Sequence, residues 1–440
     1  MPSPFIAALI DFVNREQDTQ NQQVATLWQQ PIGQRVAAGE AVSAVEVLDI
    51  QALRATLRTR QNFSKFRPND NLRISFDAPT SGLAVACVLE AEQEDILTIS
   101  PSYRSSFENL RRGGGYTLDR DQVDVRYILI NFLKSLEEEP GVEYRLRAWL
   151  DGTLLPKFQP ERLQQAAAQV AQLGFNPSQA HAFAHAYAAE NYYLIQGPPG
   201  TGKTWVLAHL ANQLAQNGER VLISAFTHRA INNALRAVAQ KTANRHVIKI
   251  GQHHHADDLA WSDWFVPNYE KLEASPYRAS SSGFIVGATP YALRTSRLVG
   301  VAFDTVIFDE AGQMNLPLAL AGIQAGQRAI FFGDHQQMPP IITAEHEHDW
   351  VRKSVFEQLF QHAPGTMLDT TYRMNSAIND FPSKRFYRGA LLPHISARER
   401  LLELPHAPQR YAQLLAPSPA AIFVAIAHSG NGMRSPQEAE

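Results

Sequence analysis

Residues 197–204 place the strongest constraint on what this chain can fold into. They follow the apolar run Tyr192–Ile195 and precede a segment whose apolar residues have helical spacing. A strand, a glycine-rich loop and a helix in this order form a phosphate-binding loop, because backbone N–H groups and the helix N-terminus face the phosphates. A glycine turn that happens to carry a lysine is the alternative, and the flanking pattern disfavours it. We therefore predict a nucleotide site made by Gly197, Pro198, Pro199, Gly200, Thr201, Gly202, Lys203 and Thr204.

Two side chains of this loop, and two acids further along the chain, have the chemistry of nucleotide hydrolysis. Lys203 is expected to reach the β- and γ-phosphates, and the Thr204 hydroxyl to bind Mg²⁺. The apolar run Thr305–Phe308 ends in Asp309 and Glu310. Beside a phosphate-binding loop, the first acid is expected to hold Mg²⁺ and the second to polarise the attacking water. Together these residues predict hydrolysis rather than binding alone.

Composition limits the class of protein. The chain has 440 residues, enough for about three domains. Its formal charge of −3 means that any contact with nucleic acid has to come from local grooves rather than from a basic surface. The single cysteine, Cys87, excludes an intramolecular disulfide and fits a reducing compartment. No apolar run approaches the ~18 residues of a membrane span. We expect a cytoplasmic protein without a membrane segment.

The first part of the chain predicts a small barrel carried between two helices. Apolar residues recur every three or four positions over 4–29, which indicates an amphipathic helix. From about 41 to 101 they alternate with polar residues, and turn sequences separate short strands. A second amphipathic helix follows over 125–136. We expect a stalk helix in 1–36, a β-barrel in 41–115, and a returning stalk helix with a linker in 116–155.

Two short stretches allow a functional interpretation and a plain one. Arg111–Gly115 could contact phosphate, but a flexible surface turn is favoured. His253–His255 could bind a metal beside two acids, but a solvated loop is favoured. The same holds for His346 and His348. We therefore predict no metal site beyond the one for Mg²⁺.

From residue 156 onward, helical and strand-like segments alternate, which predicts a parallel sheet with helices on both faces. The nucleotide-binding domain is expected to span 156–362. Helices are predicted at 161–173, 178–190 and 204–216. Besides the strand before the loop, strands are predicted at Val221–Phe226, Val247–Ile250, Phe284–Ala288, Thr305–Phe308 and Ala329–Phe332.

Two polar stretches near predicted strands are ambiguous from their residues alone. Gly333–Pro340 follows a buried strand, and it is either a sensor of the γ-phosphate or a polar loop closed by prolines. Asn176 and Pro177 suit the start of a helix. Gln179 has both an amide donor and an acceptor and could pair with adenine N6 and N7. Without further context, it marks only a helix start.

The order of six motifs resembles superfamily 1B helicases. The resemblance extends over essentially the whole chain, and it favours the subgroup of the nonsense-mediated-decay RNA helicase, senataxin and the immunoglobulin-mu-binding helicase. It implies a RecA-like domain in 156–362, preceded by the barrel on its stalk, with ATP hydrolysis coupled to 5′–3′ movement on single-stranded RNA or DNA. The matching stretches are Asn176–Gln179, Gly197–Thr204, Ala225–Asn233, Asp309–Gln313, Gly333–Pro340 and Thr371–Asn375.

The resemblance also implies roles for residues that the patterns alone leave open. It assigns Gln179 and Tyr372 to the adenine, the first through its amide and the second by stacking. Gln337 is assigned to the γ-phosphate, and Arg373 is expected to reach phosphate from a second RecA-like domain. The nucleic-acid backbone is assigned to Thr227, His228 and Thr289.

The sequence departs from the family pattern near its end. After a predicted strand at Ala421–Ala427, the family's motifs V and VI are absent, so 366–440 is expected to be a partial second RecA-like domain. We expect this chain to bind Mg²⁺–ATP but to hydrolyse it poorly unless another chain supplies the missing half. The rival hypothesis is an ATP-dependent module that binds nucleic acid or a partner without moving. A kinase or GTPase is disfavoured, since nothing resembles an acceptor pocket or a guanine-reading motif.

Overall fold

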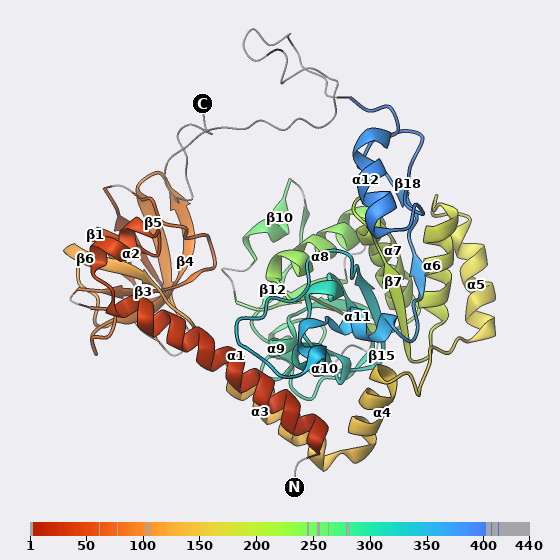
Figure 1. Ribbon diagram of the computed structural model, residues 1–440, viewed down its shortest axis with the longest axis horizontal. Coiled ribbons are helices and arrows are strands. Elements are labelled where there is room, and N and C mark those ends of the chain that lie inside the picture. Colours follow the sequence, from red (N-terminus) through yellow and green to blue (C-terminus); the bar gives the residue numbers. More distant parts are fainter. Residues whose placement is uncertain are drawn as a thin grey trace. The chain divides into compact units, whose positions relative to one another are not determined.

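The computed structural model describes residues 3–60, 62–76, 78–102, 105–243, 246–252, 256–262, 264–278, 280, 282–401, 406 and 412. Two compact units are present in this part of the chain. The smaller one contains residues 14–126, and the larger one contains residues 3–13 and 127–401 (Figure 1). Each unit is described by itself below.

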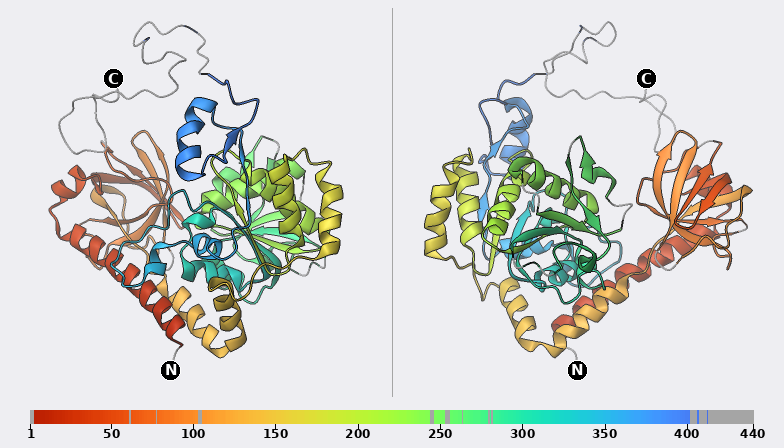
Figure 2. Two further views of the ribbon diagram at one scale, coloured as in Figure 1. Left: turned by 45° about the vertical axis from the view of Figure 1, so that its right-hand side comes forward. Right: turned by 180° about the vertical axis from the view of Figure 1, so that it is seen from behind.

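The smaller unit contains a closed antiparallel barrel, which Figure 2 shows in orange. Its strand order is β1-β2-β5-β4-β3-β6. The predicted alternation fills it: Leu72 and Ile74 from one strand, and Cys87 and Leu89 from its neighbour, are all buried. A short helix, α2 (Ile32–Ala37), precedes the first strand. The strands are β1 (Ala41–Gln51), β2 (Arg54–Arg58), β3 (Asn71–Ser75), β4 (Val85–Gln93), β5 (Ile96–Pro101) and β6 (Gly113–Arg120).

The last strand of the barrel corrects two sequence predictions. Gly113–Gly115 are the first residues of β6, not part of a surface turn, and the barrel continues beyond the predicted end at residue 115. Gly113 and Gly115 have φ values of +128° and +98°, which side chains rarely tolerate. A strand that begins with glycines in such conformations lacks the apolar alternation by which strands are recognised.

The larger unit is built on an eight-stranded sheet whose strands are all parallel, as predicted. Its order is β12-β9-β13-β8-β14-β15-β7-β16. The strands are β7 (Tyr192–Gln196), β8 (Arg220–Ser224), β9 (Val247–Ile250), β12 (Asn268–Tyr269), β13 (Phe284–Gly287), β14 (Phe303–Phe308), β15 (Gly326–Gly333) and β16 (Thr366–Met367). A hairpin, β10 (Ala260–Trp261) with β11 (Trp264–Phe265), lies outside this sheet.

Helices cover both faces of the sheet. Successive residues of each strand point to opposite faces, so both faces carry apolar side chains for helices to pack against. Tyr193 and Ile195 pack with α5, α6, α7 and α8 on one face. Tyr192 and Leu194 belong to the core of the other face, with α9, α10 and α11. These helices are α5 (Pro160–Val170), α6 (Pro177–Ala188), α7 (Lys203–Gln216), α8 (His228–Thr242), α9 (Pro290–Leu293), α10 (Leu316–Ile323) and α11 (Val355–Phe360). The three helices predicted before and after the loop are thereby confirmed.

The two stalk helices are also present. Helix α1 (Pro4–Gln29) begins in the larger unit and continues into the smaller one. Its Leu9 is buried in the same core as Leu133 of α3 (Arg126–Ser135). Helix α4 (Pro140–Leu150) follows, and among the described residues no helix is long and apolar enough to cross a membrane. Short 3₁₀ helices are η1 (Leu136–Glu138), η3 (Asp257–Leu259), η4 (Leu272–Ala274), η5 (Ala311–Gln313) and η6 (Asp349–Arg352).

The segment predicted to begin a second domain starts one strand later than expected. Strand β16 falls inside the range 366–440, yet it pairs with β7 at the edge of the first sheet. After it come α12 (Ser376–Phe386) and the paired strands β17 (Thr370–Thr371) and β18 (Leu392–Pro393). The predicted strand at Ala421–Ala427 and His253–His255 lie outside the described residues. The remaining domain boundaries stay predictions.

Candidate nucleotide site

The glycine-rich loop connects β7 to α7, as the sequence predicts. Gly200 and Gly202 have φ values of +74° and +82°, which favour glycine. A Cβ atom on Gly200 would lie 2.3 Å from the Cβ of Arg373, and one on Gly202 would lie 2.6 Å from Nε2 of Gln179. The loop therefore needs glycine both for its own conformation and for the close approach of its neighbours. Its shape fits a phosphate cradle at the N-terminus of a long helix.

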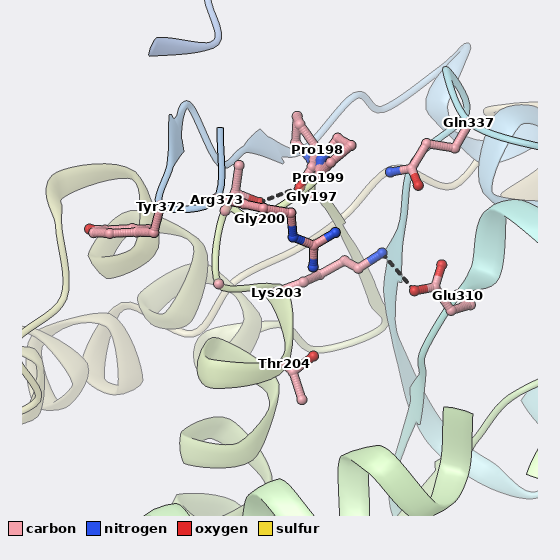
Figure 3. Close-up of a pocket in the computed structure, with 12 residues that line it drawn as sticks. Gly197, Pro198, Pro199, Gly200, Lys203, Thr204, Glu310, Gln337, Tyr372 and Arg373 are labelled. Carbon is pink, nitrogen blue, oxygen red and sulfur yellow. Dashed lines mark hydrogen bonds and ion pairs between the residues drawn. The ribbon is translucent and has the colours of Figure 1, made fainter. Parts of the chain in front are cut away.

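The loop forms one wall of a cavity of about 490 Å³ (Figure 3). Residues from four separate parts of the sequence meet there, and most of the predicted site is among them. Asp309 and Gln179 do not line this cavity. The lining residues are Gly197, Pro198, Pro199, Gly200, Thr201, Gly202, Lys203, Thr204, Glu310, Gln337, Tyr372 and Arg373.

The cavity contains two cationic side chains suited to binding an anion, and one carboxylate lies beside them. Lys203 Nζ lies 3.1 Å from Glu310 Oε1, and Figure 3 shows this ion pair at the same end of the cavity as Gln337. Glu310 has a φ of +52°, a strained conformation for a residue with a side chain. The Arg373 guanidinium extends toward Lys203 and has no hydrogen-bond partner among the described residues. Two cations are thus available to phosphate, and one carboxylate is placed near it.

Asp309 lies next to this cavity rather than in it. Asp309 and Thr204 line an adjoining cavity of about 260 Å³, which Glu310 also borders. Burial raises the pKa of the Asp309 carboxyl to about 6, and the ammonium group of Lys203 opposes that rise. A carboxylate and a hydroxyl on one wall beside the loop are oxygen donors of the kind that Mg²⁺ prefers. The residues present therefore fit the predicted metal.

Gln337 is held toward the cavity by a buried acid. Its Nε2 donates to Oδ2 of Asp334, 2.8 Å away, and Asp334 is 3% exposed. Both residues follow β15, whose end lies beside the end of β7. A polar group in this position can distinguish whether a terminal phosphate is present. This arrangement favours the sensor interpretation of the stretch 333–340 over that of a plain polar loop.

Gln179 has a different environment from the predicted one. Its Oε1 accepts from the backbone N–H of Asn176 at 3.1 Å, which completes a capping box at the start of α6. Its Nε2 donates to the carbonyl oxygen of Thr201 at 3.0 Å. The side chain is buried, and both ends of its amide are bonded to backbone. Its role toward adenine stays a prediction, and the structure provides a second role as a brace of the loop.

Replacing Gln179 with alanine distinguishes these two roles. Because the Gln179 amide is already hydrogen-bonded within the protein, we expect Gln179→Ala to weaken the binding of ATP and of GTP by a similar factor. The loss of two hydrogen bonds that brace the loop should lower both affinities about three- to tenfold. Competition titrations of both nucleotides against a fluorescent analogue measure this. The control is Gln216→Ala, an exposed residue at the end of α7 opposite to the loop. A loss confined to ATP would instead establish that Gln179 recognises adenine.

Tyr372 and the residues around it close the side of the cavity away from Glu310. The ring centroids of Tyr372 and His394 lie 4.6 Å apart, and the Tyr372 hydroxyl accepts a hydrogen bond from Nδ2 of Asn176 at 3.1 Å. Its backbone N–H donates to the carbonyl oxygen of Gly200 at 2.8 Å, and Thr371 Oγ1 donates to that of Pro199 at 2.9 Å. This segment is therefore attached to the loop through backbone atoms. Stacking of Tyr372 on adenine stays a prediction.

The three residues predicted to contact nucleic acid lie just beyond the carboxyl ends of two neighbouring strands of the sheet. Thr227 follows β8, and Thr289 follows the neighbouring strand β13. Thr227 caps α8 by accepting from the N–H of Ala230 at 3.2 Å, while Thr289 is the N-cap of α9 without a side-chain bond. His228 is the first residue of α8. Their contact with a nucleic-acid backbone stays a prediction.

Sequence reasoning missed the residues that hold the site together rather than line it. Asp334 accepts from its neighbours Gln336 and Gln337, and also from the distant residues Gln196 and Tyr387. Asn176 and Thr371 contribute through side-chain bonds to residues almost 200 positions away, with separations of 196 for the first and 172 for the second. Pairs so far apart leave no periodic signal in one sequence. Only the motif that contains Asp334 drew attention to it.

Known families match two consecutive parts of the chain. A family model described as an AAA domain matches residues 174–263 and 279–345. A second model, also described as an AAA domain, matches residues 351–438. The first contains the loop, Asp309 and Gln337, and the second contains Tyr372 and Arg373.

Individual proteins give a consistent comparison. The "DNA replication ATP-dependent helicase/nuclease DNA2" of Saccharomyces cerevisiae is 31% identical over 54% of this chain and 16% of its own length. The protein of the same name from Gallus gallus is 26% identical over 83% of this chain and 39% of its own length. This chain therefore spans well under half of these relatives. The crystal structure of arterivirus nonstructural protein 10 (helicase) aligns with 86% of this chain and 65% of its own, at 14% identity and a TM-score of 0.37.

The tandem AAA domains, the helicase relatives and the site agree on one assignment. Four of the six motifs that carried the resemblance contribute to one cavity, with the loop, Glu310, Gln337 and Arg373 on its walls. The predicted subgroup within superfamily 1B is compatible with these matches and stays a prediction. This chain belongs to the superfamily 1 helicases.

Proposed function

We propose that this chain binds and hydrolyses ATP and couples that cycle to single-stranded nucleic acid, as an ATP-dependent helicase or translocase. The observation that supports the proposal most is the single cavity in which Lys203, Glu310, Gln337 and Arg373 meet. Phosphoryl transfer needs positive charge around the terminal phosphates and a group that orients water. Lys203 and Arg373 supply the first, and Glu310 supplies the second.

Mg²⁺ is part of the proposal. Thr204 and Asp309 would hold it, since both line the adjoining cavity beside the loop. When bound, the metal would neutralise negative charge on the phosphates. Lys203 and Glu310 would orient the terminal phosphate and water from the other side.

Nucleic acid is proposed to contact Thr227, His228 and Thr289, which lie beyond the carboxyl ends of β8 and β13. Thr227 lines the same cavity as Asp309, so the proposed contact surface borders the nucleotide site directly. The curated relatives are named for DNA replication, so single-stranded DNA is the first substrate to test and RNA the second. A cytoplasmic location also belongs to the proposal, on the strength of the single cysteine.

The test is ATP turnover by the chain with single-stranded DNA, with single-stranded RNA and with neither. We expect turnover to be stimulated by one of the strands. We expect binding of that strand to weaken steeply between about 50 and 200 mM salt, because phosphate contacts release counterions. Strand binding that requires ATP without any turnover would favour the clamp hypothesis. ATP turnover that neither single-stranded DNA nor single-stranded RNA stimulates would contradict the proposal.

A further inference from the structure

One buried carboxylate beside the nucleotide cavity accepts four hydrogen bonds. Asp334 Oδ1 accepts from Nε2 of Gln196 at 3.0 Å and from the N–H of Gln336 at 3.2 Å. Its Oδ2 accepts from Nε2 of Gln337 at 2.8 Å and from the hydroxyl of Tyr387 at 2.7 Å. Full satisfaction of a buried charge fixes the orientation of every group that donates to it.

The donors come from three parts of the molecule that a nucleotide would link. Gln196 is the last residue of β7, immediately before the phosphate loop. Gln337 lines the cavity at the end where Lys203 pairs with Glu310, opposite Tyr372 (Figure 3). Tyr387 directly follows α12, in the segment that begins with the loop-bound residues 371–373.

Tyr387 is presented to Asp334 by a braced helix end. The side chains of Asn379 and Ser383, both in α12, donate to the carbonyl oxygen of Leu391 at 2.8 and 2.7 Å. Tyr387 is 6% exposed. Burial, together with donation to Asp334, raises the pKa of its phenol well above the usual range, so the hydroxyl remains a donor. The bond therefore persists as long as the end of α12 is docked.

We propose that Tyr387 is a positioning residue for Gln337. Through Asp334 it holds the Gln337 amide toward the end of the cavity that receives the terminal phosphate. Without the phenol, Oδ2 of Asp334 keeps Gln337 as its remaining bonded donor, while Oδ1 keeps Gln196 and Gln336, so the position of Oδ2 is less constrained. Recognition of a triphosphate then depends on α12 as well as on the loop. This inference rests on the proposed nucleotide site and deepens it.

Tyr387→Phe removes only the hydroxyl and tests the inference through nucleotide affinity. With Mg²⁺ present, we expect ATP affinity to fall about five- to tenfold, less than for a direct hydrogen bond to a charged group, because Tyr387 acts only through Asp334 and Gln337. ADP affinity should stay unchanged. Gln337→Ala should give a similar selective loss, and the double variant should lose little more. Competition against a fluorescent nucleotide measures all four ratios.

The control is Tyr193→Phe, because Tyr193 is also buried and its hydroxyl bonds to Thr366, away from the cavity. This control should leave both affinities unchanged. An unchanged ATP-to-ADP ratio in Tyr387→Phe, or equal losses of ATP and ADP, would overturn the role of Tyr387 alone. Failure of the parent chain to bind ATP would overturn the proposed function itself.

Discussion

Lys203→Ala is expected to reduce ATP affinity about 100-fold, the effect of losing a charged hydrogen-bond donor to phosphate. Lys203 is the loop's only cationic side chain, and its Nζ already lies in the cavity, 3.1 Å from Glu310. Arg373 remains in the variant, so some attraction for phosphate persists. Equilibrium titration with a fluorescent ATP analogue measures the loss.

The fold should survive this change. The pair with Glu310 is partly exposed, with the Glu310 side chain 38% accessible, so breaking it costs less than about 1 kcal/mol of unfolding free energy. A thermal unfolding curve that matches the parent establishes this. Lys134→Ala, on the exposed face of α3, is the matched control. Unaltered ATP affinity in folded Lys203→Ala would remove the phosphate role of this lysine.

Glu310→Gln is expected to separate ATP binding from ATP hydrolysis. The substitution preserves size and removes the charge that we propose to polarise water, so turnover should fall about 10²- to 10⁴-fold. ATP affinity should rise about two- to fivefold, because Lys203 loses the anion that competes with phosphate in the nucleotide-free site. The two effects have opposite signs, which a misfolded site cannot produce.

Single-turnover measurements with the chain in excess over ATP make even a slow parent rate accessible. Glu273→Gln, an exposed position in η4, is the control and should behave as the parent does. Hydrolysis at the parent rate by Glu310→Gln would assign the water-orienting role to another residue. Parallel losses of binding and turnover would mean that Glu310 maintains the shape of the loop.

The six inner strands of the parallel sheet could be predicted because they are largely buried on both faces, whereas the two-residue edge strands β12 and β16 were missed. Val247–Ile250 is a short, mostly apolar run, and β9 has the same ends. The phosphate-binding loop and the acids after β14 were equally clear from the sequence. In each case an apolar strand ends directly before a recognisable set of residues, the glycines and lysine of the loop or the two carboxylates after β14. The glycine-led strand β6 was missed, because Gly113 and Gly115 resemble a turn in composition.

The finer structure of the site depended on contacts that no local pattern contains. The amide of Gln179 is bonded to Thr201 and Asn176, and nothing in the sequence indicates that both of its ends are occupied. Tyr387 lies 53 residues from Asp334, so no local pattern connects its hydroxyl with that acid. Such roles are determined by tertiary structure, so they become visible only when the elements are assembled.

The attachment of residues 371–373 to the phosphate loop has a consequence for protein engineering. The bond from Tyr372 to Gly200 uses main-chain atoms, and the second bond to the loop comes from Thr371. The side chain at position 372 can therefore be randomised while the segment keeps its anchor. Since Tyr372 is predicted to stack on adenine, a library at this position, selected for binding of nucleotides with modified bases, would test whether base preference can be changed without redesigning the phosphate-binding loop.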